Sequence, residues 1–343
     1  MPFKVLFRAD ASPIIGGGHI YRCLTLADQL SAIGIDVSFA CSHETLRFVS
    51  KLQKTNYKIY PLDPLCDLPY DVVDGVQSFD LLVLDHYDWE LENEKNAVKF
   101  IPKLMKIDDL PEKKTIADVV LNQNLGIEKE DYSGLVKPSA RLLMGPTFAL
   151  LRPVFYETRK KIIHSRQIQK NVNDIVISPG LSDAADMTSI VLETLFEIGY
   201  NGKIQITIGR DSPNIEKIKE TIKNEKNIHL HVNCEYMEEL YAKADLCVGA
   251  AGSSSWERCS LGLPTVSVIV AKNQEKIAHF LAEKNISPFV RLDKSTKKLN
   301  VMLEKLFLDT NLRKQYSDNS LNACEGNGCM LVVEVIRSML TAE

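Results

Sequence analysis

The feature that most constrains the fold is a regular alternation of short apolar runs with longer segments of helical periodicity. Strand-like runs are predicted at 4–8, 36–41, 81–84, 104–107 and 119–121, and helices at 20–33 and 44–53. Such alternation is typical of parallel sheets whose strands are joined by crossover helices. The run 81–84 is apolar at every position, as expected of a strand buried on both faces of such a sheet.

The same alternation restarts after a basic segment around 156–173, which we interpret as a solvated helix leading into a linker. Strands are predicted at 174–178, 203–208, 228–232, 246–248 and 265–270, with helices between them and a helical stretch at about 300–343. A chain of 343 residues is also too long for one comfortable core. We therefore predict an α/β fold with two doubly wound, Rossmann-like domains, 1–160 and 171–343, and an interdomain cleft. The terminal helix is a candidate to pack back on the first domain.

Composition and charge exclude several classes of function. The net charge is -4, from 41 basic and 45 acidic residues mixed along the chain, so we expect no nucleic acid partner. No apolar run reaches membrane-spanning length and the first residues lack a signal-peptide core, which predicts a cytoplasmic protein without membrane insertion. The eight cysteines form no Cys-x-x-Cys pair, and no Asp-x-Asp motif occurs, so we predict buried thiols and no metal site.

The first polar motif is Arg8-x-Asp10 followed by Gly16-Gly17-Gly18-His19 and Arg22. Glycines between a strand and a helix let the backbone approach a ligand, and the helix start favours negative charge. The helix dipole disfavours the imidazolium form of His19, so we expect a neutral imidazole suited to accepting a proton from water. The alternative is that His19 caps the helix or binds a phosphate. Tyr21 replaces the third glycine of the dinucleotide fingerprint, and no cofactor is expected.

The second motif is Asp85-His86-Tyr87-Asp88, directly after the run 81–84. Two carboxylates, an imidazole and a phenol at one strand end are suited to polarising a water or binding sugar hydroxyl and acetamido groups. The alternative is a loop in which Asp88 caps the next helix.

The third motif runs from Val248 to Arg258 and contains Gly252-Ser253-Ser254-Ser255 and Glu257. Small residues and hydroxyls at a helix start provide N–H and O–H donors for a diphosphate, and Glu257 is placed to accept hydrogen bonds from a ribose diol. The alternative is a serine N-cap with Glu257 as its capping-box partner. Capping alone does not require two glycines and three serines, so we favour ligand binding. Asn273-Gln274 follows a later strand and offers further amide donors.

Together these motifs resemble the UDP-sugar hydrolases of pseudaminic acid biosynthesis (the PseG type), relatives of the GT-B glycosyltransferases. The resemblance spans nearly the whole chain and includes Asp108-Asp109, Gly145-Pro146 and Leu261 to Pro264. It implies a GT-B-like fold, and metal-independent removal of UDP from UDP-2,4-diacetamido-2,4,6-trideoxy-β-L-altropyranose by water attack at the anomeric carbon, with inversion. His19 then activates water. The predicted sugar-side contacts are Arg8, Asp10, Gly17, Gly18, Arg22, Asp85, Tyr87 and Asn273. The predicted UDP contacts are Gly252, Ser253, Ser254, Ser255 and Glu257.

One position departs from this family. Where the family commonly has a Gly-Gly-Ser-Asp type loop, the chain has Gly180-Leu181-Ser182-Asp183. Leucine is costly at positive φ, so we expect a different backbone path or strain, which leaves a related 2,4-diamino sugar nucleotide open as substrate. Two competing hypotheses for the function are a GT-B glycosyltransferase and a nucleotide-sugar-binding protein without catalysis. No clear lipid-acceptor patch supports the transferase, and the retained His19 argues against binding alone.

Overall fold

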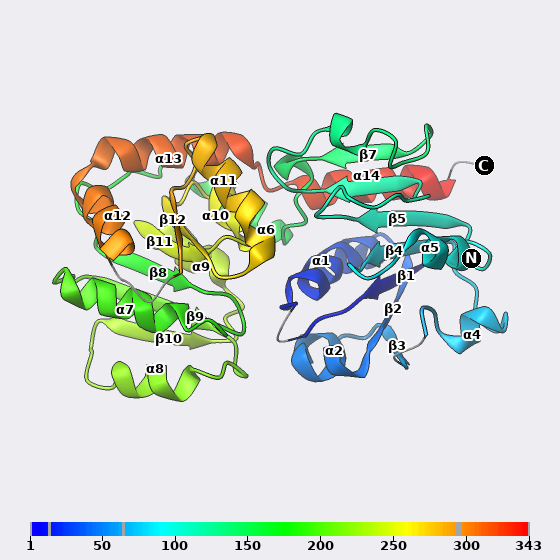
Figure 1. Cartoon of the computed structure of the whole chain (residues 1–343), viewed down its shortest axis with the longest axis horizontal. Helices are drawn as coiled ribbons and strands as arrows, with labels where there is room; N and C mark the ends of the chain where they lie inside the picture. The colour runs from blue at the N-terminus through cyan, green and yellow to red at the C-terminus, as the bar shows by residue number, and fades with distance from the viewer. Residues whose placement is uncertain (1, 13–14, 64–65, 293–296, 342–343) are drawn as a thin grey trace. The chain divides into compact units, whose positions relative to one another are not determined.

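The computed structural model describes residues 2–12, 15–63, 66–292 and 297–341. The chain divides into two compact units, Met1–Arg152 with Asn327–Glu343, and Pro153–Gly326 (Figure 1). Each unit is a parallel sheet with helices on its faces, which confirms the predicted fold class.

The first unit contains a seven-stranded sheet in the order β3-β2-β1-β4-β5-β6-β7. Its strands are β1 (Lys4–Ala9), β2 (Asp36–Ser42), β3 (Lys58–Leu62), β4 (Leu81–Asp85), β5 (Lys103–Ile107), β6 (Val119–Asn122) and β7 (Arg141–Met144). Its helices are α1 (Gly18–Ala32), α2 (His43–Phe48), α3 (Ser50–Gln53), α4 (Tyr70–Val73), α5 (Leu91–Ala97) and α14 (Gly328–Thr341), with 3-10 turns η1 (Lys129–Tyr132) and η2 (Pro146–Phe148). The helix predicted over 44–53 is thus interrupted between α2 and α3.

The core of the first unit follows from the alternation of side chains along its strands. Val5 and Phe7 of β1 face one side of the sheet, where they pack in one cluster with residues of α1 and α14, whereas Leu6 belongs to the cluster on the other face. Val332 and Ile336 of α14 are fully buried in the first of these clusters. The C-terminal helix therefore belongs to the first unit.

The second unit contains a six-stranded sheet in the order β10-β9-β8-β11-β12-β13. Its strands are β8 (Asp174–Ser178), β9 (Lys203–Ile208), β10 (Ile228–Val232), β11 (Leu246–Ala250), β12 (Thr265–Ile269) and β13 (Phe289–Arg291). Its helices are α6 (Pro153–Ile162), α7 (Met187–Glu197), α8 (Ile215–Thr221), α9 (Met237–Lys243), α10 (Ser254–Ser260), α11 (Glu275–Glu283), α12 (Lys297–Leu308) and α13 (Thr310–Ala323), with the 3-10 turn η3 (Lys272–Gln274).

The first unit ends at Arg152 rather than at residue 160, because α6 packs against α9 and α10 of the second unit. Arg159 on α6 donates hydrogen bonds to the carbonyls of Ser260 (2.9 Å) and Leu321 (2.9 Å). Arg166, beyond the helix, donates to the carbonyl of Ala244 (2.9 Å). These basic side chains of the segment predicted as solvated instead join helices and loops of the second unit.

Both sheets reverse their strand order at one point, between β1 and β4 in the first unit and between β8 and β11 in the second. Ligands of open α/β sheets bind at the carboxyl ends of the strands that flank such a reversal. The motifs around His19 and Asp85 follow β1 and β4, and the serine-rich motif follows β11. The fold thus puts each motif where this rule expects a ligand.

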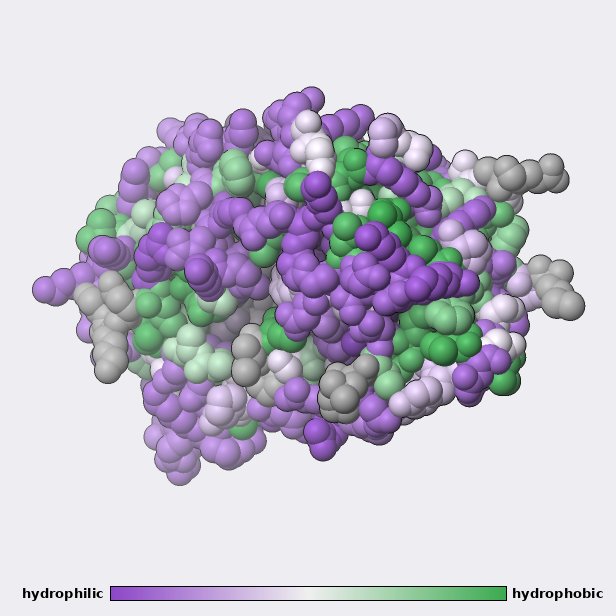
Figure 2. All heavy atoms as spheres, turned by 45° about the vertical axis from the view of Figure 1, so that its right-hand side comes forward, coloured by the Kyte–Doolittle hydropathy of each residue, from purple (hydrophilic) through white to green (hydrophobic). Residues whose placement is uncertain are grey.

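Polar side chains cover much of the face shown in Figure 2, with apolar ones scattered among them. Exposed large apolar residues include Tyr70, Val76 and Leu308. Across the described ranges, no helix has both the length and the hydropathy that a membrane crossing requires.

Candidate active site

The loop between β1 and α1 is anchored by the carboxylate of Asp10. Asp10 Oδ1 accepts hydrogen bonds from the backbone N–H of Ser42 (2.6 Å) and the hydroxyl of Thr45 (2.9 Å), and its Oδ2 accepts from Arg8 Nη1 (2.8 Å). Burial alone would raise the pKa of Asp10, but the hydrogen bond from His86 and the Arg8 charge hold it well below its ordinary value. The Asp10 carboxylate and Arg8 Nη1, both of residues predicted to contact the sugar, are thus engaged within the protein, whereas Arg8 Nε is buried without a hydrogen-bond partner.

The glycines set the path of the chain into α1. Gly16 has a φ of 84°, a conformation that favours glycine, and its N–H donates to the carbonyl of Ser12 (2.7 Å). Gly17 is the N-cap residue of α1 and Gly18 its first residue. His19 therefore lies in the first turn and does not cap the helix, which removes the capping interpretation of this residue.

His19 pairs with the carboxylate of Asp85 at the end of β4. His19 Nδ1 lies 2.6 Å from Asp85 Oδ1, in a pair that is nearly excluded from solvent. The ring of Tyr87 contacts His19 edge-on, with 4.7 Å between ring centroids. The sequence pattern placed Asp85 among the sugar contacts, but it is 1% exposed and lies behind His19.

Arg22, one turn further along α1, joins two carboxylates. Its Nε and Nη2 donate to Asp85 (both 2.6 Å), and its Nη1 and Nη2 donate to Asp109 (2.8 and 2.9 Å). Burial would raise the pKa of both carboxyl groups, but the Arg22 guanidinium lowers them below their ordinary values. Both carboxylates are therefore ionised near neutral pH, and Arg22 is bound within the protein rather than free to contact a sugar.

The hydroxyl of Tyr87 donates to Asp109 Oδ2 (2.9 Å). Burial, together with the Asp109 charge, raises the pKa of Tyr87 well above its ordinary value, so the phenol stays protonated. Tyr87 thus contributes an aromatic wall beside His19. Its hydroxyl is already used as a donor.

This arrangement fixes which nitrogen of His19 carries the proton. Nδ1 faces an ionised carboxylate at 2.6 Å, so it carries the hydrogen and donates it, although Arg22 Nη2 lies 3.1 Å from the same nitrogen. Nε2 has no hydrogen-bond partner in the described part of the chain. With Nδ1 protonated, Nε2 is the ring nitrogen that can accept a proton. The carboxylate also stabilises the imidazolium that forms when Nε2 takes a proton.

The second histidine of this region, His86, is placed differently. Its Nδ1 accepts from the backbone N–H of Asp88 (3.1 Å) and its Nε2 lies 3.1 Å from Asp10 Oδ2. Both ring nitrogens are thus engaged, so His86 positions Asp10. Asp88 does not cap the next helix, because the N-cap of α5 is Glu90, which forms a capping box with Asn93.

In the second unit, the serine-rich loop between β11 and α10 surrounds a buried arginine. Arg258 is 1% exposed and donates to the hydroxyls of Ser254 and Ser255 (both 3.0 Å) and to the carbonyl of Ala250 (2.9 Å). Ser253 is the N-cap residue, but its side chain makes no capping hydrogen bond. The structure therefore does not support the alternative in which a serine side chain caps α10.

The predicted UDP contacts of this loop differ in accessibility. Ser253 is exposed, and Gly252, Ser254 and Glu257 are half-buried. Ser255 is only 2% exposed and its oxygen accepts from Arg258, so it supports the loop from inside instead of facing a ligand.

Asn273 lies exposed in the turn η3, as a ligand contact requires. Its neighbour Gln274 is more constrained, because its Oε1 accepts from the backbone N–H of Val270 (3.0 Å). A Cβ placed on Gly252 would lie 3.9 Å from Gln274 Nε2, so this amide nitrogen borders the serine-rich loop.

The supporting roles of Asp109 and Arg258 were not predicted, although both residues belong to motifs named from the sequence. Gln274 was predicted as an amide donor beside Asn273. A basic residue one turn into the helix that follows a serine-rich loop is a signal that could have indicated the role of Arg258.

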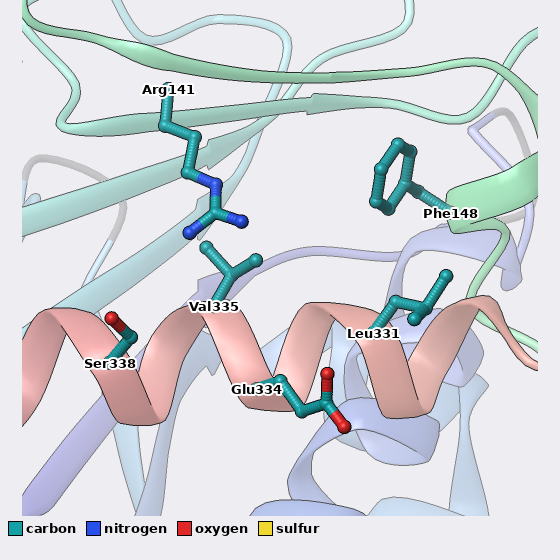
Figure 3. A pocket seen from close by; sticks show the side chains of 6 residues that line it. All are labelled: Arg141, Phe148, Leu331, Glu334, Val335 and Ser338. Atoms are coloured by element: carbon teal, nitrogen blue, oxygen red, sulfur yellow. The ribbon is translucent and has the colours of Figure 1, made fainter.

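A cavity of about 300 Å³ lies in the first unit between α14 and the start of β7 (Figure 3). It is lined by Arg141, Phe148, Leu331, Glu334, Val335 and Ser338. None of these belongs to the three motifs, so this cavity is separate from the candidate site.

The chain is similar in sequence to known proteins. Residues 175–326 match the model of the glycosyltransferase family 28 C-terminal domain. The chain is 30% identical over 285 residues to the UDP-2,4-diacetamido-2,4,6-trideoxy-beta-L-altropyranose hydrolase of Campylobacter jejuni, covering 82% of this chain and 97% of that protein.

Solved structures show the same fold at low sequence identity. MurG of Acinetobacter baumannii matches with a TM-score of 0.68 at 17% identity, covering 98% of this chain and 100% of that one. UDP-GlcNAc 2-epimerase from Neisseria meningitidis matches with a TM-score of 0.62 at 12% identity, with coverage of 98% and 100%. The chain therefore belongs to the family of the UDP-2,4-diacetamido-2,4,6-trideoxy-beta-L-altropyranose hydrolase, and it is an enzyme whose two parallel-sheet α/β domains have the fold of GT-B glycosyltransferases.

Proposed function

We propose that the protein hydrolyses UDP-2,4-diacetamido-2,4,6-trideoxy-β-L-altropyranose to UDP and 2,4-diacetamido-2,4,6-trideoxy-L-altrose, a reaction of pseudaminic acid biosynthesis. The observation that carries this proposal is the His19–Asp85 pair, with Nδ1 held by a carboxylate at 2.6 Å and Nε2 open, in a chain of the hydrolase family. A hydrolase needs a group that accepts a proton from water, and His19 is built for that task.

The reaction proceeds in one displacement. The oxygen of water forms a bond to the anomeric carbon while the bond from that carbon to the UDP oxygen breaks, and UDP leaves with the electron pair. The water proton passes to Nε2 of His19, and Asp85 stabilises the resulting imidazolium. A single displacement from the side opposite to UDP inverts the configuration. Because a diphosphate is a good leaving group once its charge is stabilised, a base matters more than an acid.

The second unit is proposed to bind UDP. Gly252, Ser253 and Ser254 present backbone and hydroxyl donors to the diphosphate, and Glu257 accepts from the ribose diol. Asn273 is proposed to contact the sugar. The chain has no Asp-x-Asp motif with which to clamp a metal on the diphosphate, so the reaction is proposed to run without a metal.

The test is to incubate the protein with this UDP-sugar and EDTA, without an acceptor, and to follow the products by NMR. We expect free UDP and an initial product of inverted anomeric configuration. No free UDP under these conditions would exclude the hydrolase, and release only on addition of an acceptor would establish a transferase. A related 2,4-diamino sugar nucleotide, assayed in parallel, tests the sugar preference.

The His19→Ala variant tests the assignment of the base. Turnover is expected to fall by about 10²-fold or more, as for loss of a general base, while the Kd for UDP stays unchanged. Near-normal turnover in this variant would mean that another group is the base.

A further inference from the structure

Arg258 is a buried cation that lacks a protein counter-ion. No carboxylate in the described ranges forms an ion pair with it, and its Nε is buried without a hydrogen-bond partner. Its terminal nitrogens donate to neutral oxygens, those of Ala250, Ser254 and Ser255. Burying a charge is costly unless it is paired and hydrogen-bonded, and Nε of this guanidinium has no partner.

The backbone around Arg258 is shaped to admit the guanidinium. A Cβ added to Gly249, at the end of β11, would lie only 2.7 Å from Arg258 Nη1. Gly249 has no positive φ, so its missing side chain serves this close approach and not an unusual backbone conformation. The backbone beside the serine-rich loop therefore leaves the space that the Arg258 guanidinium occupies.

We propose that Arg258 positions the serine-rich loop for the diphosphate and supplies the fixed positive charge that stabilises UDP as it leaves. This proposal rests on the proposed UDP site and assigns it a charge that the family resemblance did not. It also explains how a leaving diphosphate is stabilised in a reaction proposed to run without a metal.

Arg258 also sets the direction of the Ser254 hydroxyl. Because the oxygen of Ser254 accepts a hydrogen bond from Arg258, its own hydrogen must point away from the guanidinium. Ser254 is half-buried, so this hydrogen is available to a ligand at the loop surface. An oriented hydroxyl donor next to a fixed cation binds an anionic oxygen and does not favour a neutral group.

The experiment compares the affinities of UDP and uridine by isothermal titration calorimetry. In Arg258→Met, the ratio of UDP affinity to uridine affinity is expected to fall by about 10- to 100-fold, because only UDP carries the diphosphate. A merely structural role would weaken both ligands alike. The matched control is Arg313→Met, since Arg313 is equally buried (1% exposed) and donates to the backbone carbonyls of Gln169 (2.6 Å) and Lys170 (2.9 Å). In Arg313→Met, the ratio of UDP affinity to uridine affinity should not change.

An unchanged ratio in a folded Arg258→Met protein would overturn the proposal. If that variant does not fold, Arg258→Lys decides, because lysine keeps the charge but cannot make all three hydrogen bonds of the planar fork. The ratio is then expected to fall several-fold, and no fall overturns the proposal. Failure of the wild-type protein to bind UDP would instead refute the proposed function itself, so the two outcomes are distinguishable.

Discussion

The substitution Asp85→Asn tests the catalytic pair most directly, because it removes a charge while keeping the shape of the side chain. The amide has two possible orientations. In either orientation the NH₂ group faces an Arg22 donor 2.6 Å away, Nη2 beside Oδ1 or Nε beside Oδ2, so one hydrogen bond to Arg22 is lost. With NH₂ toward His19, the amide donates to Nδ1, which leaves the hydrogen on Nε2 and removes the proton acceptor. With its oxygen toward His19, the tautomer is kept, but the negative charge that stabilises the imidazolium is gone.

Both orientations impair His19 as a base, either by the change of tautomer or by loss of the charge that stabilises the imidazolium. Loss of a positioned general base costs about 10²- to 10⁴-fold, so we expect kcat to fall by about 10³-fold, or about 4 kcal/mol of transition-state stabilisation. The fold should survive because Arg22 keeps its two hydrogen bonds to Asp109. We expect the free energy of unfolding to fall by about 1–3 kcal/mol, as for a lost hydrogen bond to a charged group.

The assay is the rate of UDP release, measured together with the Kd for UDP and a urea melt. The control is Asp109→Asn, because Asp109 binds the same arginine but makes no hydrogen bond to His19; its kcat should fall much less. A second comparison adds Asp85→Asn to a His19→Ala protein, where it should have little further effect if the two residues act as a unit. A near-normal kcat in Asp85→Asn, or a further 10²-fold loss in the absence of His19, would refute the reasoning.

Three further predictions concern stability and binding. Tyr87→Phe removes the hydrogen bond to Asp109 but keeps the ring beside His19, so the free energy of unfolding should fall by about 1 kcal/mol in a urea melt; no change would mean that the bond contributes nothing. The pKa of Asp10 is lower in the folded than in the unfolded state, so its stabilising contribution is full above about pH 5 and is lost as the pH falls through 4 and below. In urea melts between pH 5 and pH 3, the free energy of unfolding should fall less in Asp10→Asn than in the wild-type protein. An equal fall in the two proteins would contradict this. Glu257→Ala should weaken UDP and uridine alike, by about tenfold, and an unchanged calorimetric affinity would refute its contact with ribose.

The strands that could be predicted are those whose burial imposes a recognisable pattern. β8 has the predicted bounds because its apolar residues form a continuous run, and β9 because its isoleucines alternate with polar residues. β10 was found although it lies at a sheet edge, since its residues alternate strictly between apolar and polar. β3, β7 and β13 were missed. All three are edge strands with mixed burial, and β3 contains Pro61, so neither pattern is present.

Within the candidate site, residue types could be predicted but side-chain partners could not. His19 and Asp85 were both singled out, yet they were treated as separate features because they are 66 positions apart in the sequence. Their contact depends on the pairing of β1 with β4, in which Ala9 lies opposite Asp85. The structure adds a carboxylate 2.6 Å from Nδ1, which orients the His19 ring and which no spacing in the sequence indicates.

The loop that departs from the family pattern does not carry the strain that a leucine suggested. Gly180 takes the positive φ of 97°, and Leu181 has no positive φ. Asp183 and Asp186 adopt the left-handed conformations, with φ of 42° and 54°. Aspartate tolerates the left-handed region better than a branched apolar residue does. The loop is held by the N–H of Gly209, which donates to the carbonyl of Leu181 (2.9 Å), and a Cβ on Gly209 would lie 2.5 Å from that oxygen. Leu181 is therefore accommodated by a glycine on the neighbouring strand end, and its presence alone gives no physical reason to expect a different substrate.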